Sequence, residues 1–247
     1  MGILFEGLRP SRKIKQSWVK AYFIDLDGVL IDSIDECWLV ATKAYFGFVH
    51  TDPFIKNFFY KHRGLVGPPY QYFTLLDLII RAAEDEKELS DDEISSQFKR
   101  LVKGYSHKKK LETEKIFFEK RGELKKDKRF WLSLHKLTEY GKYLQNRPLE
   151  NYFLITTKDR SSVNALTSHF GLAFNEIYSN EDINEKGSKA IIIDSILESS
   201  EKFTTAVFVD DSPDHLELID NKSVKCYFAD WGYGNNESFE IFDRSLW

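Results

Sequence analysis

The segment "YFIDLDGVLIDS", residues 22–33, places two aspartates, Asp25 and Asp27, at the end of an apolar run. Side chains two residues apart in an extended chain point to the same side. Two carboxylates this close repel each other and resist burial unless a cation neutralises them. A second acidic pair, Asp210 and Asp211, follows another apolar run in "TAVFVDDS". The spacing therefore indicates a site where acids act together with a cation.

Short apolar runs typical of buried strands recur along the chain and are separated, after the first, by helical segments. The runs are residues 18–25, 152–156, 176–179, 205–210 and 224–229. Strands that alternate with helices predict an α/β fold, a doubly wound parallel sheet with helices on both faces. Ligands bind such sheets at the carboxyl ends of the strands. The two acidic pairs and Thr156 should therefore meet at one edge.

Residues 33–147 are far too many for one crossover between strands, and their apolar residues recur at helical spacing. A helical insertion that leaves and re-enters a sheet at one point is expected to form a second domain over that point. We therefore predict a catalytic core made of residues 1–32 and 148–247, and a helical cap domain at 33–147. Within the cap, Arg63 is a candidate for contacting substrate, although a solvated surface arginine is the simpler interpretation.

Four acids that converge at one edge cannot all ionise without a cation. Mg²⁺ suits an all-oxygen site, because it keeps several waters and accepts substrate phosphate oxygens as further ligands. The sequence therefore predicts Mg²⁺ as the cofactor. Asp214 in "SPDHLELI" is either a further group near the metal or an acid in the first turn of a helix.

These motifs resemble those of the haloacid dehalogenase superfamily in its phosphatase branch. "FIDLDGVLIDS" is similar to the first motif of that family, which implies Asp25 as the nucleophile and Asp27 as the acid/base. "LITTK" is similar to the second motif, so Thr156 would bind the phosphoryl group. "FVDDSPD" resembles the fourth motif. The expected metal-site residues are Asp25, Asp27, Asp210 and Asp211.

The third motif of that family supplies a lysine for the phosphate, and "EKGSK" offers two, Lys186 and Lys189. We favour Lys186, because Gly187 follows it and would place it at the start of a helix, near the strand ends. Backbone N–H groups at a helix N-terminus also favour an anion. Lys189 would then lie one turn further from that edge, with its head in water.

The resemblance implies a phosphatase that hydrolyses a small phosphorylated metabolite through an aspartyl-phosphate. The acid at position 27 argues against the dehalogenase branch of the family. A phosphomutase of the same build and a phosphonate hydrolase with a cap lysine are alternatives. A receiver-like domain that accepts a phosphoryl group for signalling is an alternative from another class, against which the large cap argues.

The amino-acid composition indicates the class of protein and the compartment in which it works. A chain of 247 residues with 42% hydrophobic and 30% charged residues is typical of a globular protein. No apolar run approaches the roughly 20 residues of a membrane helix, no signal-peptide core is present, and two cysteines fit a reducing compartment. We therefore expect a cytoplasmic protein without a membrane partner; its oligomeric state is open.

Residues 99–129 hold thirteen Lys or Arg against five Asp or Glu, although the whole chain carries a net charge of −4. Solvated helix faces explain this segment most simply, and a basic lid that attracts an anionic ligand is the alternative. Aromatic residues are not interleaved as in an RNA-binding signature, so nucleic acid is not an expected partner.

Overall fold

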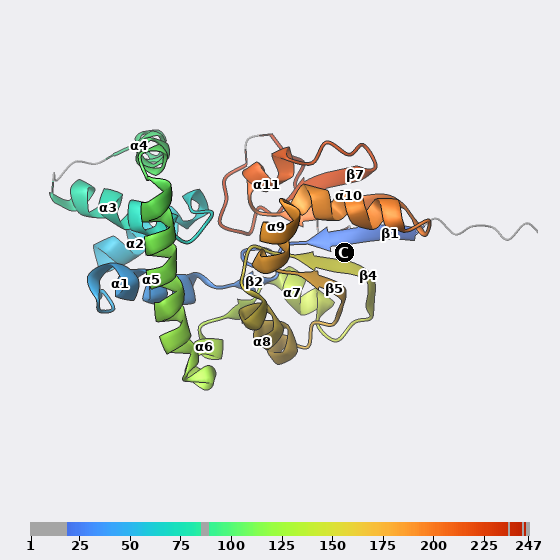
Figure 1. Ribbon diagram of the computed structural model, residues 1–247, viewed down its shortest axis with the longest axis horizontal. Coiled ribbons are helices and arrows are strands. Elements are labelled where there is room, and N and C mark those ends of the chain that lie inside the picture. Colours follow the sequence, from blue (N-terminus) through green and yellow to red (C-terminus); the bar gives the residue numbers. More distant parts are fainter. Residues whose placement is uncertain (1–18, 85–88, 237, 244, 246–247) are drawn as a thin grey trace, which may run out of the picture.

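The computed structural model describes residues 19–84, 89–236, 238–243 and 245, and its centre is a parallel β-sheet (Figure 1). Among these residues, five strands lie in the order β5-β4-β1-β6-β7. They are β1 (Val19–Ile24), β4 (Leu149–Ile155), β5 (Phe174–Tyr178), β6 (Phe203–Asp210) and β7 (Val224–Phe228). The chain builds one half of the sheet and then crosses β1 to build the other. This reversal is the switch point at which ligands bind such sheets.

The sheet separates two hydrophobic clusters, because successive side chains of a strand point to opposite faces. In β1, Ala21 and Phe23 pack into the cluster that holds Ile192 and Ile193, whereas Ile24 packs into the other. Helices α10 (Lys189–Ser199) and α11 (Pro213–Glu217) cover the first face, and α7 (Glu139–Leu144) and α8 (Arg160–Phe170) cover the second (Figure 1). Helix α9 (Asn180–Lys186) precedes α10. The predicted α/β fold is confirmed.

The segment between β1 and β4 forms a helical unit on the left of Figure 1, next to the carboxyl ends of the strands. A third hydrophobic cluster, which includes Trp38, Phe59, Leu76, Phe98 and Phe117, holds this unit together. Its elements are α1 (Ile34–Phe46), α2 (Pro53–Lys61), the 3₁₀ turn η1 (Arg63–Leu65), α3 (Gln71–Glu84), α4 (Asp91–Lys103), α5 (His107–Lys125) and α6 (Lys128–Ser133). We call this unit the cap.

Two short strands, β2 (Ile31–Asp32) and β3 (Lys136–Leu137), connect the cap to the sheet. They pair antiparallel, with Ile31 opposite Leu137, so the chain enters and leaves the cap side by side. Helix α7 packs closely against Leu30, just before β2. A β-carbon at Gly141 of α7 would lie only 2.2 Å from the carbonyl oxygen of Leu30, so this close approach requires glycine. The connection is therefore compact.

The packing bears on the domain division expected from the sequence, which put 33–147 in the cap. Tyr140 and Leu144 of α7 lie in the cluster beside the sheet. Trp131 of α6 lies in the same cluster, so α6 packs against the core. We infer that the cap ends with α6 and that residues 138–147 belong to the core. Trp18 and the preceding residues of the expected core lie outside the described residues. No helix in the described part of the chain is long and apolar enough to cross a membrane.

Candidate active site

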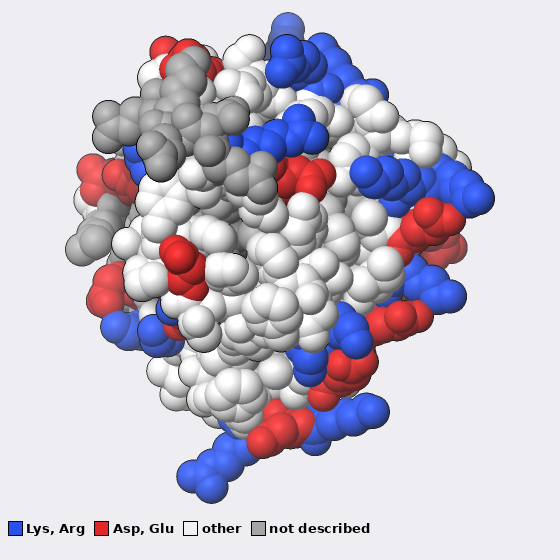
Figure 2. Space-filling view, turned by 90° about the vertical axis from the view of Figure 1, so that its left-hand side faces the viewer, with Lys and Arg blue, Asp and Glu red and all other residues white. Residues whose placement is uncertain are grey.

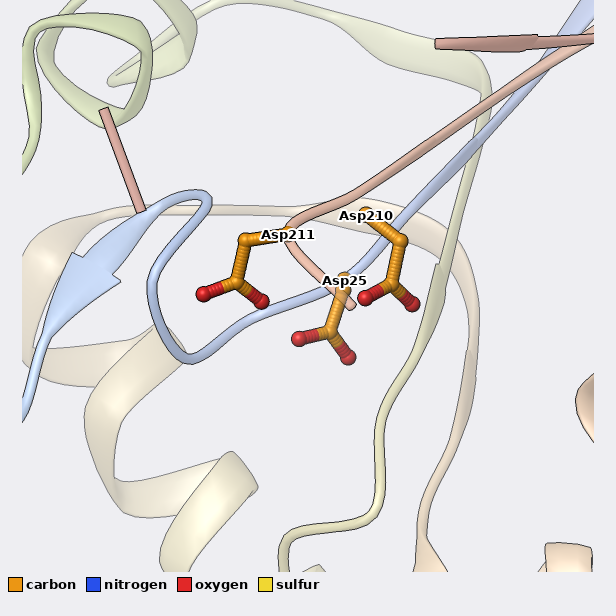
Figure 3. Close-up of side chains that lie close together, drawn as sticks. All are labelled: Asp25, Asp210 and Asp211. Carbon is orange, nitrogen blue, oxygen red and sulfur yellow. The ribbon is translucent and has the colours of Figure 1, made fainter. Parts of the chain in front are cut away.

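Three carboxylates gather at the carboxyl ends of the two central strands (Figure 3). Asp25 follows β1, Asp210 is the last residue of β6, and Asp211 follows it. All three are buried, and one oxygen of each lies within 4.8 Å of the others. The amide of Asp25 donates a hydrogen bond to the carbonyl of Val209 at 3.0 Å, which holds the ends of β1 and β6 together. The structure thus brings together three of the four predicted acids.

The electrostatics of this cluster favour a bound cation. Burial, partly offset by Lys189, raises the pKa of Asp25 to about 6. Burial and the charges of Asp210 and Asp25 raise the pKa of Asp211 to about 7. The pKa of Asp210 is lowered, because Lys189 and His215 outweigh its burial. An oxygen-only set of buried acids, two of which resist ionisation, is a donor set that suits a hard divalent cation.

Lys189 is the lysine of this site, and the placement of the two candidates reverses the preference for Lys186. The Nζ of Lys189 lies 2.6 Å from Oδ1 of Asp25 and 2.7 Å from Oδ2 of Asp210. Lys186 is exposed, and its Nζ lies 4.9 Å from the ring centre of Tyr178.

The error came from the position of the helix start. Gly187 does not open a helix: it adopts φ +111° and ends α9 at Lys186. Ser188 is the N-cap of the next helix, α10, because its side chain accepts a hydrogen bond from the amide of Ile191. Lys189 is therefore the first residue of α10, the position that the sequence analysis assigned to Lys186.

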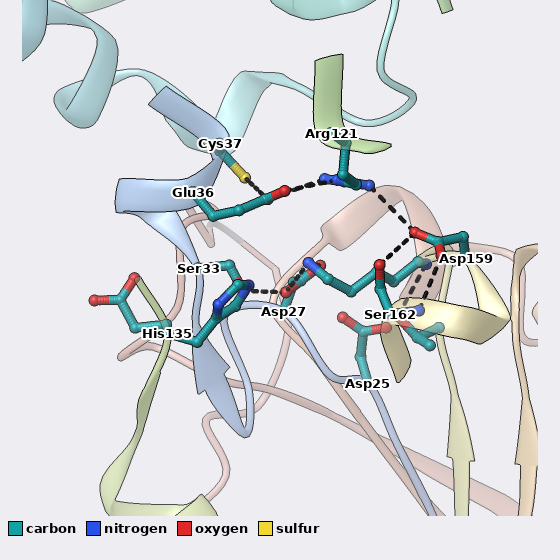
Figure 4. Close-up of polar contacts among 12 residues, drawn as sticks. Asp25, Asp27, Ser33, Glu36, Cys37, Arg121, His135, Asp159 and Ser162 are labelled. Carbon is teal, nitrogen blue, oxygen red and sulfur yellow. Dashed lines mark hydrogen bonds and ion pairs between the residues drawn. The ribbon is translucent and has the colours of Figure 1, made fainter. Parts of the chain in front are cut away.

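Asp27, the fourth acid expected at the metal site, lies outside the cluster of the other three. Its carboxylate is bound by other side chains, among them Ser33 (Figure 4). Both of its oxygens accept hydrogen bonds from Nζ of Lys158, at 3.0 and 2.9 Å, and Oδ1 also accepts one from the Ser33 hydroxyl. Burial alone would raise the pKa of Asp27, but Lys158 and Ser33 outweigh it and lower the pKa to about 2. Asp27 is therefore an ionised carboxylate in a fixed orientation.

Thr156 lies at the end of β4, as predicted, and its side chain is buried. Its hydroxyl oxygen accepts a hydrogen bond from the amide of Lys158 at 3.2 Å. Thr157 is exposed and lies outside this arrangement. Asp214 is also exposed and occupies the first turn of α11, which resolves its two interpretations in favour of the helix acid.

Three residues that contact the acids of the site were missed from the sequence, two through their side chains and one through its backbone amide. Lys158 contacts Asp27; the Nδ1 of His215 lies 3.0 Å from Oδ2 of Asp210; and the amide of Tyr233 donates to Oδ2 of Asp211 at 2.7 Å. For Lys158 a signal existed, because it follows Thr156 by two residues at a strand end. His215 has no ligand spacing in the sequence, so no comparable signal pointed to it.

The cap reaches the core through a buried ion pair next to the site (Figure 4). In the cap, Nε and Nη2 of Arg121 donate to the carboxylate of Glu36 at 2.7 and 3.0 Å. Nη1 of Arg121 lies 3.7 Å from Oδ2 of Asp159, the N-cap residue of α8 in the core. This bridge connects α1 and α5 to the loop that carries Lys158.

The basic segment 99–129 forms mainly the end of α4 and helix α5, which buries Phe117 and Arg121 but none of its lysines. Its lysines pair with acids one turn away, as Lys108 does with Glu112 and Lys115 with Glu119. Figure 2, which views the cap side, shows positive and negative residues intermingled along the right-hand edge. This intermingling favours solvated helix faces over a uniform basic lid.

A family model of haloacid dehalogenase-like hydrolases matches residues 19–218, and the chain belongs to this family. No curated protein matches the sequence significantly. Solved structures show the same fold. A haloacid dehalogenase-like family protein from Streptococcus pneumoniae is 20% identical, with a TM-score of 0.52 over 87% of each chain.

Two further solved structures extend this likeness of fold. A predicted phosphoglycolate phosphatase from Haemophilus somnus 129pt is 18% identical, with a TM-score of 0.53 over 91% of this chain and 90% of the other. A predicted phosphatase from Clostridium acetobutylicum is 17% identical, with a TM-score of 0.53 over 88% of each chain.

Proposed function

We propose that this protein is a Mg²⁺-dependent phosphatase that hydrolyses a small phosphorylated metabolite through an aspartyl-phosphate on Asp25. The observation that carries this proposal is the contact of Lys189 with both Asp25 and Asp210, beside a separately held Asp27. Lys189 thus partly offsets the burial that raises the pKa of Asp25 and so favours its ionised, nucleophilic form. Asp27, two residues away, is available for proton transfer.

In the first step, an oxygen of Asp25 attacks phosphorus and the alcohol leaves, so that the phosphoryl group is bound to the enzyme. Lys189 neutralises charge that would otherwise repel the phosphate from this nucleophile. Asp25, Asp210 and Asp211 would hold Mg²⁺, which supplies further positive charge at the phosphate oxygens. The Thr156 hydroxyl, at the end of β4, is suited to donate a hydrogen bond to the phosphoryl group.

Asp27 would transfer the protons. With its pKa lowered to about 2 by Lys158 and Ser33, against the effect of burial, it is ionised at rest and can accept a proton from the attacking water in the second step. A bound phosphate would bring negative charge near Lys158 and would weaken the ion pair between Lys158 and Asp27. The pKa of Asp27 then rises, which suits it to protonate the leaving alcohol in the first step.

The burial of the site supports a small substrate, because Asp25 is 6% exposed and Asp211 8% exposed with the cap in place. The phosphatases among the structures of the same fold agree with this substrate class. Hydrolysis inside a closed cap also excludes bulk water from the acyl phosphate until the assigned water attacks.

Steady turnover of p-nitrophenyl phosphate with Mg²⁺, and its loss in excess chelator, tests the proposal. A receiver-like domain would accept the phosphoryl group without steady turnover. Asp27→Asn should lower the rate most for substrates with poor leaving groups, because general acid help contributes roughly 10²–10⁴-fold. Undiminished turnover in excess chelator would contradict the metal dependence, and equal losses with all leaving groups would contradict the role of Asp27.

A further inference from the structure

Arg63 of the cap lies between two tyrosine rings, one from each part of the molecule. Its guanidinium carbon is 5.1 Å from the ring centre of Tyr72, in α3 of the cap, and 4.9 Å from that of Tyr233, in the core. Stacking on two rings fixes the plane of the guanidinium group. The side chain is thus held rigidly where cap and core meet.

The hydrogen-bonding capacity of Arg63 is only partly used. Nη1 donates to the carbonyl of Val66 at 2.8 Å. Nε is buried and has no hydrogen-bond partner among the described residues. Within those residues, no acid lies close enough to Arg63 to form an ion pair. A buried donor without an acceptor costs roughly 1–3 kcal/mol. An acceptor on a bound substrate would remove this cost.

Tyr233 connects Arg63 to the site. The amide of Tyr233 donates to Asp211 at 2.7 Å. Its ring lies against the turn that follows Asp27, because a β-carbon at Gly28 would be 3.1 Å from Cδ2 of Tyr233. The charge of Arg63 also acts on the carboxyls of Asp27 and Asp211. Arg63 is therefore next to the reacting groups, on their cap side.

Among the residues that the structure describes, Arg63 differs from two neighbouring cations in having no carboxylate within ion-pair distance. Arg121 pairs with Glu36, and Lys158 pairs with Asp27, so their charges are largely neutralised within the protein. The charge of Arg63 is instead available to a ligand. With Nη1 bound to Val66, Nε and Nη2 form the edge that can present two parallel N–H groups, the geometry that matches a carboxylate.

We propose that Arg63 binds a carboxylate on the alcohol part of the substrate, so that the preferred substrates are small phosphorylated hydroxy acids. This inference rests on the proposed phosphatase function and adds the substrate class to it. The cap delivers Arg63 to the site, and the phosphoryl group lies at Asp25. The carboxylate must therefore be only a few bonds from the phosphate.

The test compares two substrates of equal size, 2-phosphoglycolate and its neutral carboxamide, 2-phosphoglycolamide. Arg63→Met should lower the ratio of kcat/KM for 2-phosphoglycolate to kcat/KM for the amide by about 30- to 100-fold, because only the first substrate loses a charged pair. Arg63→Lys should restore part of the preference, because it keeps the charge but not the planar fork. Arg100→Met, on the exposed end of α4, is the matched control and should leave both values unchanged.

Each result has a definite meaning. Equal losses with both substrates in Arg63→Met and Arg63→Lys would overturn the inference, because they indicate a structural role alone. A wild-type enzyme that hydrolyses the amide as well as the acid would also overturn it, while leaving the phosphatase function intact. Failure of the wild type to hydrolyse any phosphate monoester would overturn the proposed function itself.

Discussion

The backbone of Gly64 in the cap lies directly against the carbonyl oxygen of Tyr233 in the core. A β-carbon at Gly64 would be 1.9 Å from this oxygen, well inside any allowed contact. Tyr233 also holds the entry to the cap, because its hydroxyl donates to Asp32 at 2.9 Å and accepts from the amide of Ser33 at 2.6 Å. Tyr233 of the core thus contacts Asp211 of the buried acidic cluster, the entry to the cap and the cap backbone at Gly64.

Gly64→Ala should therefore prevent the cap from seating fully on the core. The added methyl group meets backbone rather than a flexible side chain, so the two parts must separate. We expect kcat/KM for a phosphate monoester to fall at least tenfold while the protein stays folded, because closure completes the site. Gly67→Ala is the matched control in the same loop, since its nearest contact would be an ordinary 3.5 Å to Gln71. Equal activity in the two variants would show that this contact does not govern closure.

The two candidate lysines make a second matched pair. Lys189→Ala should lower kcat/KM at least 100-fold, or about 2.7 kcal/mol, because it removes the cation between Asp25 and Asp210. Lys186→Ala should cost less than threefold, because Lys186 is exposed and its Nζ lies beside the ring of Tyr178, 4.9 Å from the ring centre. Steady-state kinetics measure kcat/KM of both variants. A larger loss of kcat/KM in Lys186→Ala than in Lys189→Ala would contradict the assignment of Lys189 to the site.

The buried ring of His135 should make the free energy of unfolding depend on pH. Burial and the nearby charge of Lys158 lower its pKa to about 4. Nδ1 donates to the carbonyl of Trp131 at 2.9 Å, and Nε2 has no hydrogen-bond partner among the described residues, so the ring is neutral in the folded state. A pKa depressed below the unfolded value of 6.5 stabilises the fold above pH 6.5, and this contribution is lost as the pH falls towards 4.

The contribution of His135 is at most about 3 kcal/mol. Denaturant unfolding at pH 7.5 and at pH 4.5 measures it in the wild type and in His135→Phe. The variant should lose less stability than the wild type over this interval. An identical loss in both proteins would mean that other groups set the acid limit.

The strands and the acidic site could be predicted from the sequence, because both depend on local patterns. The run at 205–210 alternates between two buried faces and ends in Asp210, and β6 follows this pattern to its last residue. The carboxyl ends of parallel strands then bring Asp25 and Asp210 together and place Thr156 at the same edge of the sheet, by topology alone. These predictions needed no knowledge of side-chain packing.

The contacts around these groups could not be predicted in the same way. The choice between Lys186 and Lys189 depended on a helix boundary, and a two-residue break at Gly187 and Ser188 reversed it. Ser33 occupies the N-cap position of α1, yet its hydroxyl donates to Asp27 instead of capping the helix. Tyr233 and Arg63 meet across 170 positions of sequence, and only the closed cap brings them together.

The most direct test of the central claim is to detect the phosphoryl group on Asp25. Wild-type protein with Mg²⁺ and excess phosphate monoester is quenched in acid within the first turnovers, and the peptide that contains residues 22–33 is analysed by mass spectrometry. We predict a phosphorylated peptide with the modification on Asp25. In Asp25→Asn we predict neither this species nor turnover, with the fold intact. Ordinary turnover by a folded Asp25→Asn protein would contradict the account.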